Sequence, residues 1–320
     1  MLLASTGSDS KNLSLLYQTN CTRLEIAENP LSNLAVNVSL KQRHLIDRLD
    51  DECLSNIWKT RFIAEQHLAK QGYENRLCYS KLRSKTPPSW QVVPYSSPPW
   101  YLDNILCKKI YSIWTQTTVL FRTIFPPSIP SDTDLEKTKF FWHSLIPEIN
   151  YSAENKSGEG ALTNDNVINK QSVYPDITSR NDSEILLLYN YAPLQTGGEQ
   201  MHFLLVPNAK KPAKNFLELD KQQYLEVLSL TGKVAQWAEK NFNGQATIHF
   251  FDKTGEIAGQ TQPLYHAHLI IVTQEKEEKW GKLAMFFRML LPSRPLPSKE
   301  LEQRVTHYKA SLGQFLAHQH

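Results

Sequence analysis

The chain has 320 residues, of which 41% are hydrophobic, and its formal net charge is +3. This length allows about two domains with buried cores, and the small net charge argues against a dedicated binder of long nucleic acid. The first residues are too few and too uncharged for a secretory signal, and Arg122 interrupts the apolar stretch 110–125. We therefore expect a cytoplasmic protein without a membrane span.

The four cysteines all lie in the first third or so of the chain: Cys21, Cys53, Cys78 and Cys107. No two of them have the close spacing that is typical of a metal site. We expect free thiols in a reducing compartment, and a disulfide within the amino-terminal part is the alternative.

The amino-terminal part favours helices. Apolar residues recur at helical spacing within 40–70, and further helices are expected over 104–125 and 133–145. A stretch rich in Pro and Trp, residues 86–100, is expected to be a loop. We predict that residues 1–149 form a mainly helical domain of unknown role, and this domain is where a protein partner would bind.

Residues 150–183 are rich in Asn, Ser and Lys with scattered Gly, and this composition predicts a polar linker. No internal repeat is apparent in the sequence. A final helix is expected from Ser298 to about Phe315, after a group of three prolines.

The carboxy-terminal part alternates between strand and helix patterns. Apolar runs at 185–189, 201–207 and 247–251 predict strands, and a helical stripe runs through 219–240 with Asp220 as its N-cap. Residues 252–255 predict a turn that leads to the next strand.

That next strand carries two histidines, in the run Gln262-Pro-Leu-Tyr-His266-Ala-His268-Leu-Ile270. Alternation along a strand sends His266, His268 and Ile270 to one face. Two imidazoles in this arrangement are a nucleophile with its support, two metal ligands, or two core histidines held by ordinary hydrogen bonds.

The segment resembles the signature of the histidine triad (HIT) superfamily of nucleotide hydrolases and transferases, a His-x-His-x-His strand preceded by Gln and sometimes by Tyr. Gln262, Tyr265, His266 and His268 match it, and Ile270 stands where the third His would be. The resemblance extends over roughly residues 184 to 275. It implies that residues 184–320 form a HIT-like α+β domain, an antiparallel sheet with a helix packed across it.

The resemblance also implies a reaction. The middle histidine of the triad attacks the α-phosphorus in family members, and a main-chain carbonyl of the triad strand holds its other nitrogen, so His268 is the expected nucleophile and His266 its neighbour. His202 matches a fourth histidine of some members. The expected ligand is a nucleotide or a nucleotide conjugate, turned over through a nucleotidyl-histidine intermediate with no cofactor and no metal. Many members of the family form homodimers, which the resemblance therefore allows here.

Three departures bear on catalysis. Ile270 cannot donate a hydrogen bond to phosphate, and removing one such donor typically slows a reaction about a hundredfold to a thousandfold. Asn190 replaces a ribose-binding Asp, while Thr261 and Pro263 replace the Gly and Ser that hold phosphate in the family.

The expected nucleotide-binding residues combine the motif with nearby charges. Asp252 falls near the family's phosphate-binding Asn, and cations after the motif would offset the missing donors. The expected set is Asn190, Asp252, Gln262, Tyr265, Lys282 and Arg288.

Two other functions stay open. The first is a degenerate HIT module that binds a nucleotide or a protein without turnover, which Ile270 and Pro263 favour. The second is a metal site built from His266, His268 and a third ligand such as His202 or His249.

Overall fold

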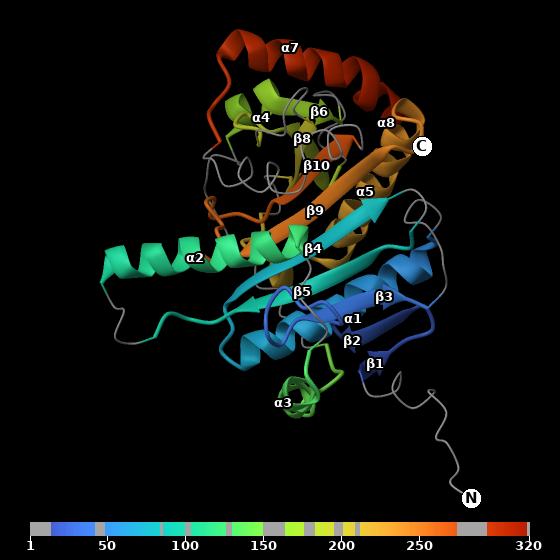
Figure 1. Ribbon diagram of the computed structural model, residues 1–320. Coiled ribbons are helices and arrows are strands. Elements are labelled where there is room, and N and C mark those ends of the chain that lie inside the picture. The colour runs from blue at the N-terminus through green and yellow to red at the C-terminus, as the bar shows by residue number, and fades with distance from the viewer. Residues whose placement is uncertain are drawn as a thin grey trace, which may run out of the picture.

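The computed structural model describes residues 14–41, 49–83, 86–99, 104–125, 130–149, 164–175, 183–194, 201–208, 212–273 and 293–318. These residues form an α+β fold around one ten-stranded sheet with the order β1-β2-β3-β5-β4-β9-β10-β8-β7-β6, in which all neighbouring strands are antiparallel (Figure 1). The expected fold class, an antiparallel sheet with a helix packed across it, is confirmed. Within these ranges no helix is long and apolar enough to cross a membrane.

The strands come in two groups along the chain. The first group is β1 (Leu15–Gln18), β2 (Thr22–Ile26), β3 (Val36–Leu40), β4 (Asn75–Arg83) and β5 (Ser89–Tyr95). The second is β6 (Ser172–Tyr174), β7 (Ile185–Tyr189), β8 (Met201–Pro207), β9 (Ala246–Thr254) and β10 (Ala267–Thr273).

The helices surround this sheet. They are α1 (Asp51–Lys70), α2 (Ile105–Ile124), α3 (Asp132–Trp142), α4 (Asp165–Gln171), the 3₁₀ turn η6 (Phe216–Glu218), α5 (Lys221–Asn241), α7 (Ser298–Tyr308), the π-helical turn η7 (Lys309–Gly313) and α8 (Gln314–Ala317). The predicted helices over 104–125, 133–145, 219–240 and 298–315 are each found within a few residues of their expected bounds. Asp220 caps α5 as expected, in a capping box with Gln223.

The expectation of a mainly helical amino-terminal domain is wrong in one respect, because this part supplies five of the ten sheet strands. β4 pairs with β9 from Arg76–Thr254 to Arg83–Thr247, so both parts of the chain share one sheet. The stretch expected to be a Pro- and Trp-rich loop contains β5. Its buried Trp90 alternates with polar neighbours over only a few residues, which gives a weak strand pattern.

The predicted polar linker also contains regular structure. Helix α4 and the edge strand β6 both lie between residues 164 and 175. β6 pairs with β7 and ends the sheet on that side.

The topology of the two parts is the same, although the sequence shows no repeat. β2, β3, α1, β4 and β5 follow one another along the chain and lie in the sheet order 2-3-5-4. β7, β8, α5, β9 and β10 do the same with the order 7-8-10-9. The two units meet where β4 pairs with β9, at the middle of the sheet.

The two faces of the sheet are covered differently. Helices α1 and α5 pack together on one face, which we call the helix face, where Phe250 and Leu269 join the main core (Figure 1). Helix α2 crosses the amino-terminal half of the other face, where its Val119 packs with Leu77 and Val93. We call this second face the histidine face.

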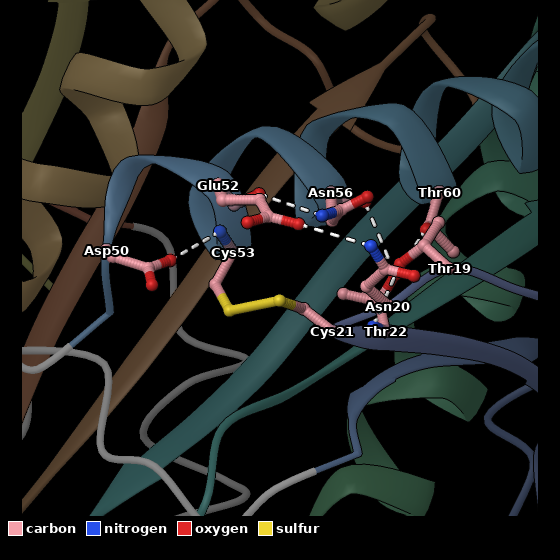
Figure 2. The surroundings of a disulfide bond; sticks show 9 residues. All are labelled: Thr19, Asn20, Cys21, Thr22, Asp50, Glu52, Cys53, Asn56 and Thr60. Atoms are coloured by element: carbon pink, nitrogen blue, oxygen red, sulfur yellow. Dashed lines mark hydrogen bonds between the residues drawn. A yellow bond between two sulfur atoms is a disulfide. The ribbon is translucent and has the colours of Figure 1, made fainter.

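A disulfide bond fixes the start of α1. Cys53 in the first turn of α1 is bonded to Cys21 in the turn between β1 and β2 (Figure 2). Asn20 beside it donates to Glu52 Oε1 at 3.3 Å. The expectation of four free thiols is therefore wrong for this pair, because the fold brings together two cysteines that are 32 residues apart. Cys78 and Cys107 are free thiols.

Helix α2 also exposes a strip of large apolar side chains. Ile105, Leu106, Ile110, Ile113 and Trp114 are each at least 58% exposed. They follow helical spacing, so the strip runs along one side of the helix. Exposed apolar strips of this kind often mark contacts with other molecules.

Candidate functional site

Three histidines lie together on the histidine face. His202 belongs to β8, His268 to the neighbouring β10, and His266 directly precedes β10. The ring of His268 is centred 5.1 Å from that of His202 and 5.0 Å from that of His266. The structure thus brings together all three histidines expected from the sequence.

Hydrogen bonds determine which nitrogen of His268 carries its proton. The backbone N–H of Leu194 donates to Nδ1 of His202 at 3.1 Å, so the proton of neutral His202 lies on Nε2. That Nε2 lies 2.9 Å from Nδ1 of His268 and donates to it. Neutral His268 therefore carries its own proton on Nε2, and this N–H is a hydrogen-bond donor.

His266 has the opposite arrangement. Its Nδ1 lies 2.8 Å from the backbone oxygen of Leu264. A carbonyl oxygen only accepts hydrogen bonds, so Nδ1 of His266 must carry the proton. The lone pair of the neutral ring is then on Nε2, and no residue in the described ranges forms a hydrogen bond with that atom.

The surroundings keep the three rings neutral. Burial, followed by the charges of His266 and Lys253, lowers the pKa of His202 to about 3. Burial also lowers the pKa of His266, and burial together with the neighbouring histidines and Lys253 lowers the pKa of His268 well below its ordinary value. Near pH 7 each ring thus has one lone pair and one N–H.

Asn190 supports His202. Its Oδ1 accepts from the backbone N–H of Ala192 at 3.1 Å, which fixes the orientation of the amide. Its Nδ2 lies 3.3 Å from Nδ1 of His202, the ring nitrogen that can accept a hydrogen bond from it. The side chain expected to bind ribose is therefore buried and bonded to a histidine.

Asp252 and Tyr265 lie on the helix face, away from the three histidines. Asp252 accepts two hydrogen bonds from the guanidinium of Arg61 in α1, at 2.6 and 2.8 Å, and one from Tyr265 Oη at 3.1 Å. Glu65 accepts from Arg61 and from Arg76, and both of its contacts are buried. The structure does not bring Asp252 and Tyr265 to the site expected for them, because alternation directs both to the opposite face.

Gln262 lies in the loop between β9 and β10 with a partly exposed side chain. Gln260, which is not among the residues expected from the sequence, has the larger role in this loop. Its Oε1 accepts from Gly255 N, and its Nε2 donates to the backbone oxygens of Lys214 and Leu264. The Leu264 oxygen that holds His266 is thus itself held by Gln260.

Lys253 and Phe251 are further residues of this face that the motif did not indicate. The ring of Phe251 stacks on that of His268, with centroids 4.5 Å apart and planes 13° apart. Nζ of Lys253 lies 5.5 Å from the centroid of Phe251. His249, Phe251 and Lys253 are alternate residues of β9, so their side chains lie on the same face as the histidines.

The remaining expected residues are distributed as follows. Lys282 and Arg288 lie outside the described residues. His249 shares the histidine face, where its Nδ1 lies 3.0 Å from Tyr79 Oη.

Within the described ranges no three His, Cys, Asp or Glu side chains are arranged to hold a metal ion. Nε2 of His202 and Nδ1 of His268 are directed at each other, which leaves neither atom available as a ligand.

No protein-family model matches this sequence, and no curated protein matches it. Solved structures with some likeness include a uridylyltransferase, at 9% identity and a TM-score of 0.43 over 86% of this chain and 74% of that chain. An ADP-glucose phosphorylase from Arabidopsis thaliana with bound ADP-glucose has 13% identity and a TM-score of 0.42 over 79% and 72%. A galt-like protein from the same plant has 14% identity and a TM-score of 0.41 over 75% and 65%. Likeness at this distance carries no argument about the reaction of this chain.

Proposed function

We propose that this protein hydrolyses or transfers the nucleotidyl group of a nucleotide phosphoanhydride or phosphoramidate, with Nε2 of His266 as the nucleophile. The hydrogen bond between His266 Nδ1 and the Leu264 oxygen carries this proposal. This bond leaves the lone pair of His266 on Nε2, with which no described residue forms a hydrogen bond. A neutral imidazole with a free lone pair near pH 7 is a competent nucleophile toward phosphorus.

This proposal changes the role that the HIT resemblance suggested for His268. In the family a main-chain carbonyl of the triad strand holds the second nitrogen of the nucleophile. Here the carbonyl of Leu264 holds His266, whereas His268 is bonded to a side chain, His202. The hydrogen bonding therefore favours His266.

The reaction proceeds in two displacements. The lone pair of His266 Nε2 forms a bond to the α-phosphorus, and the bond from phosphorus to the leaving group breaks with its electron pair passing to that group. The Leu264 oxygen stabilises the positive charge that the ring acquires. An oxygen of water or of another acceptor then attacks the phosphorus, loses its proton to solvent, and the N–P electron pair returns to Nε2.

His268 donates a hydrogen bond to a phosphoryl oxygen during these steps. Its Nε2–H follows from the bond to His202, and the stacked Phe251 fixes the plane of its ring. A fixed donor of this kind stabilises charge that develops in the transition state. It also offsets the missing donor at Ile270, which is 1% exposed.

The test is intact-protein mass spectrometry after brief incubation with adenosine and guanosine phosphoramidates, dinucleoside polyphosphates and ADP-glucose, followed by an acid-free quench. We expect a nucleotide-sized adduct that maps to the peptide containing His266 and disappears in His266→Gln. In His268→Gln the adduct forms about a hundredfold to a thousandfold more slowly, because one donor to the transition state is lost.

A nucleotide that binds without forming an adduct or any product would instead favour the non-catalytic binding module. Two observations support that second candidate: Ile270 offers no donor, and Pro263 has no backbone N–H to give to phosphate. An adduct that maps to His268 and survives in His266→Gln would return the nucleophile to the residue first expected.

A further inference from the structure

Lys253 occupies a defined place on the histidine face. Its neighbour Asp252 pairs with Ala267 of β10, so the register places Lys253 beside His266, the next residue out along that strand. On the other side it pairs with Leu77 of β4. The ammonium lies over the ring of Phe251, whose plane is stacked on His268. Lys253 therefore contacts Phe251, the ring that stacks on His268. It also lies opposite His266 in the register between β9 and β10.

No carboxylate in the described ranges forms a salt bridge with Lys253, although the side chain is partly buried. A partly buried cation normally has a counter-ion, because desolvation disfavours an isolated charge. The three imidazoles that surround the proposed reaction centre are neutral near pH 7 and offer no negative charge. Among the described residues none supplies the anion, and the phosphoryl oxygens of a ligand would do so.

We propose that Nζ of Lys253 binds the phosphoryl oxygens of the leaving group and thereby makes this site selective for phosphoanhydrides over phosphoramidates. The inference rests on the proposed function. A phosphoanhydride releases an anionic phosphate, which a neighbouring ammonium stabilises directly. A phosphoramidate releases an amine, which needs a proton and gains nothing from a positive charge.

The test compares Lys253→Met with the wild-type protein on two substrates with the same nucleoside, a dinucleoside polyphosphate and a phosphoramidate. We expect kcat/KM for the polyphosphate to fall about 10- to 100-fold, the range for a hydrogen bond to a charged group. The phosphoramidate rate should change by less than about threefold, well below that range. Lys253→Arg should retain most of the activity on the polyphosphate.

Lys240→Met is the matched control. Nζ of Lys240 lies 4.8 Å from the centroid of Phe315, so it forms a similar cation–π contact, but it belongs to α5 and is exposed. This variant should leave both rates unchanged. Equal losses on both substrates in Lys253→Met, or no loss on either, would overturn the proposed selectivity while leaving the histidine chemistry intact.

A pH profile separates charge from shape. Burial lowers the pKa of Lys253 to about 8. The titratable groups on this face are His266 just before β10, His268 on β10, His202 on β8 beyond it, Tyr79 on β4 and His249 on β9 itself. The rings of His202, His266 and His268 stay neutral above pH 7. Affinity for inorganic pyrophosphate, measured by calorimetry without nucleotide, should therefore fall above about pH 8 in the wild-type protein and should not fall in Lys253→Arg.

The pyrophosphate measurement also distinguishes the two proposals. If pyrophosphate binding depends on Lys253 but the protein forms no nucleotidyl adduct, the anion site at Lys253 is supported and the proposed reaction is contradicted. An adduct on His266 with pyrophosphate affinity unaffected by Lys253→Met would do the reverse.

Discussion

Asp252 and Lys253 are consecutive residues of β9, yet the two faces of the sheet treat their charges differently. On the helix face, Asp252 is 2% exposed and bonded to Arg61 and Tyr265. On the histidine face, the ammonium of Lys253 lies over the ring of Phe251, and no acidic side chain among the described residues forms a salt bridge with it. The charge of Asp252 is neutralised within the fold and contributes to its stability, whereas the charge of Lys253 is available to a ligand.

The largest expected effect is on the helix face. Arg61→Met removes the cation between Asp252 and Glu65 and leaves two buried carboxylates without it. We expect a loss of about 3–5 kcal/mol in the free energy of unfolding, measured by urea denaturation. The double variant Arg61→Met with Asp252→Leu should recover part of this loss. A single variant as stable as the wild type would show that the network is not structural.

The disulfide should affect stability without affecting ligand binding. Cys21 and Cys53 close a loop with a sequence separation of 32, so Cys53→Ser should cost about 2–4 kcal/mol. Pyrophosphate affinity should not change, since the bond lies at the start of α1, on the helix face. A matched control is Cys107→Ser, which alters a free thiol and should leave the free energy of unfolding unchanged. A fall in affinity in Cys53→Ser would couple the two faces.

His202 should make the fold sensitive to mild acid. Its pKa is about 3 in the folded protein and about 6.5 when unfolded, so the unfolded state binds more protons between these values. Stability should therefore be fully present above about pH 6.5 and fall as the pH drops, by at most about 1.4 kcal/mol per pH unit. Denaturation from pH 7 to 5 should show a shallower slope in His202→Gln. Identical slopes would contradict the buried neutral assignment.

The smallest expected effect is that of Lys253→Met on stability. Because the ammonium has no salt bridge in the described ranges and is partly desolvated, its removal should leave the free energy of unfolding equal to or above that of the wild type. Thermal unfolding of both proteins at pH 7 measures this. A loss of more than about 1 kcal/mol, an ordinary value for removing a structural contact, would identify Lys253 as part of the fold.

The sequence was most informative where hydrophobic periodicity was long or strong. The strands over 185–189 and 201–207 and the helix capped by Asp220 are continuous apolar patterns, and the structure has them. The strands β1 to β3 have four or five residues each, so alternation in them covers too few positions to be distinguished from a loop.

The site was predictable to the level of a shared face. Alternation places His266 and His268 together. The sequence predicts a turn over 252–255, but β9 continues to Thr254, so the placement of Asp252 and Lys253 on opposite faces was not predictable. The protonated nitrogen of each ring was not predictable, because it depends on the Leu264 oxygen and the Leu194 N–H, backbone groups placed by tertiary structure.

The junction between β4 and β9 has a consequence for how this chain can be divided. A piece that began near residue 184 would keep every residue of the HIT resemblance, but it would expose the long edge of β9 and leave Asp252 buried without Arg61. An unpaired edge of this length is a template for aggregation. A chimaera that takes one half from a homologue must therefore take Arg61, β4 and β9 together from the same protein.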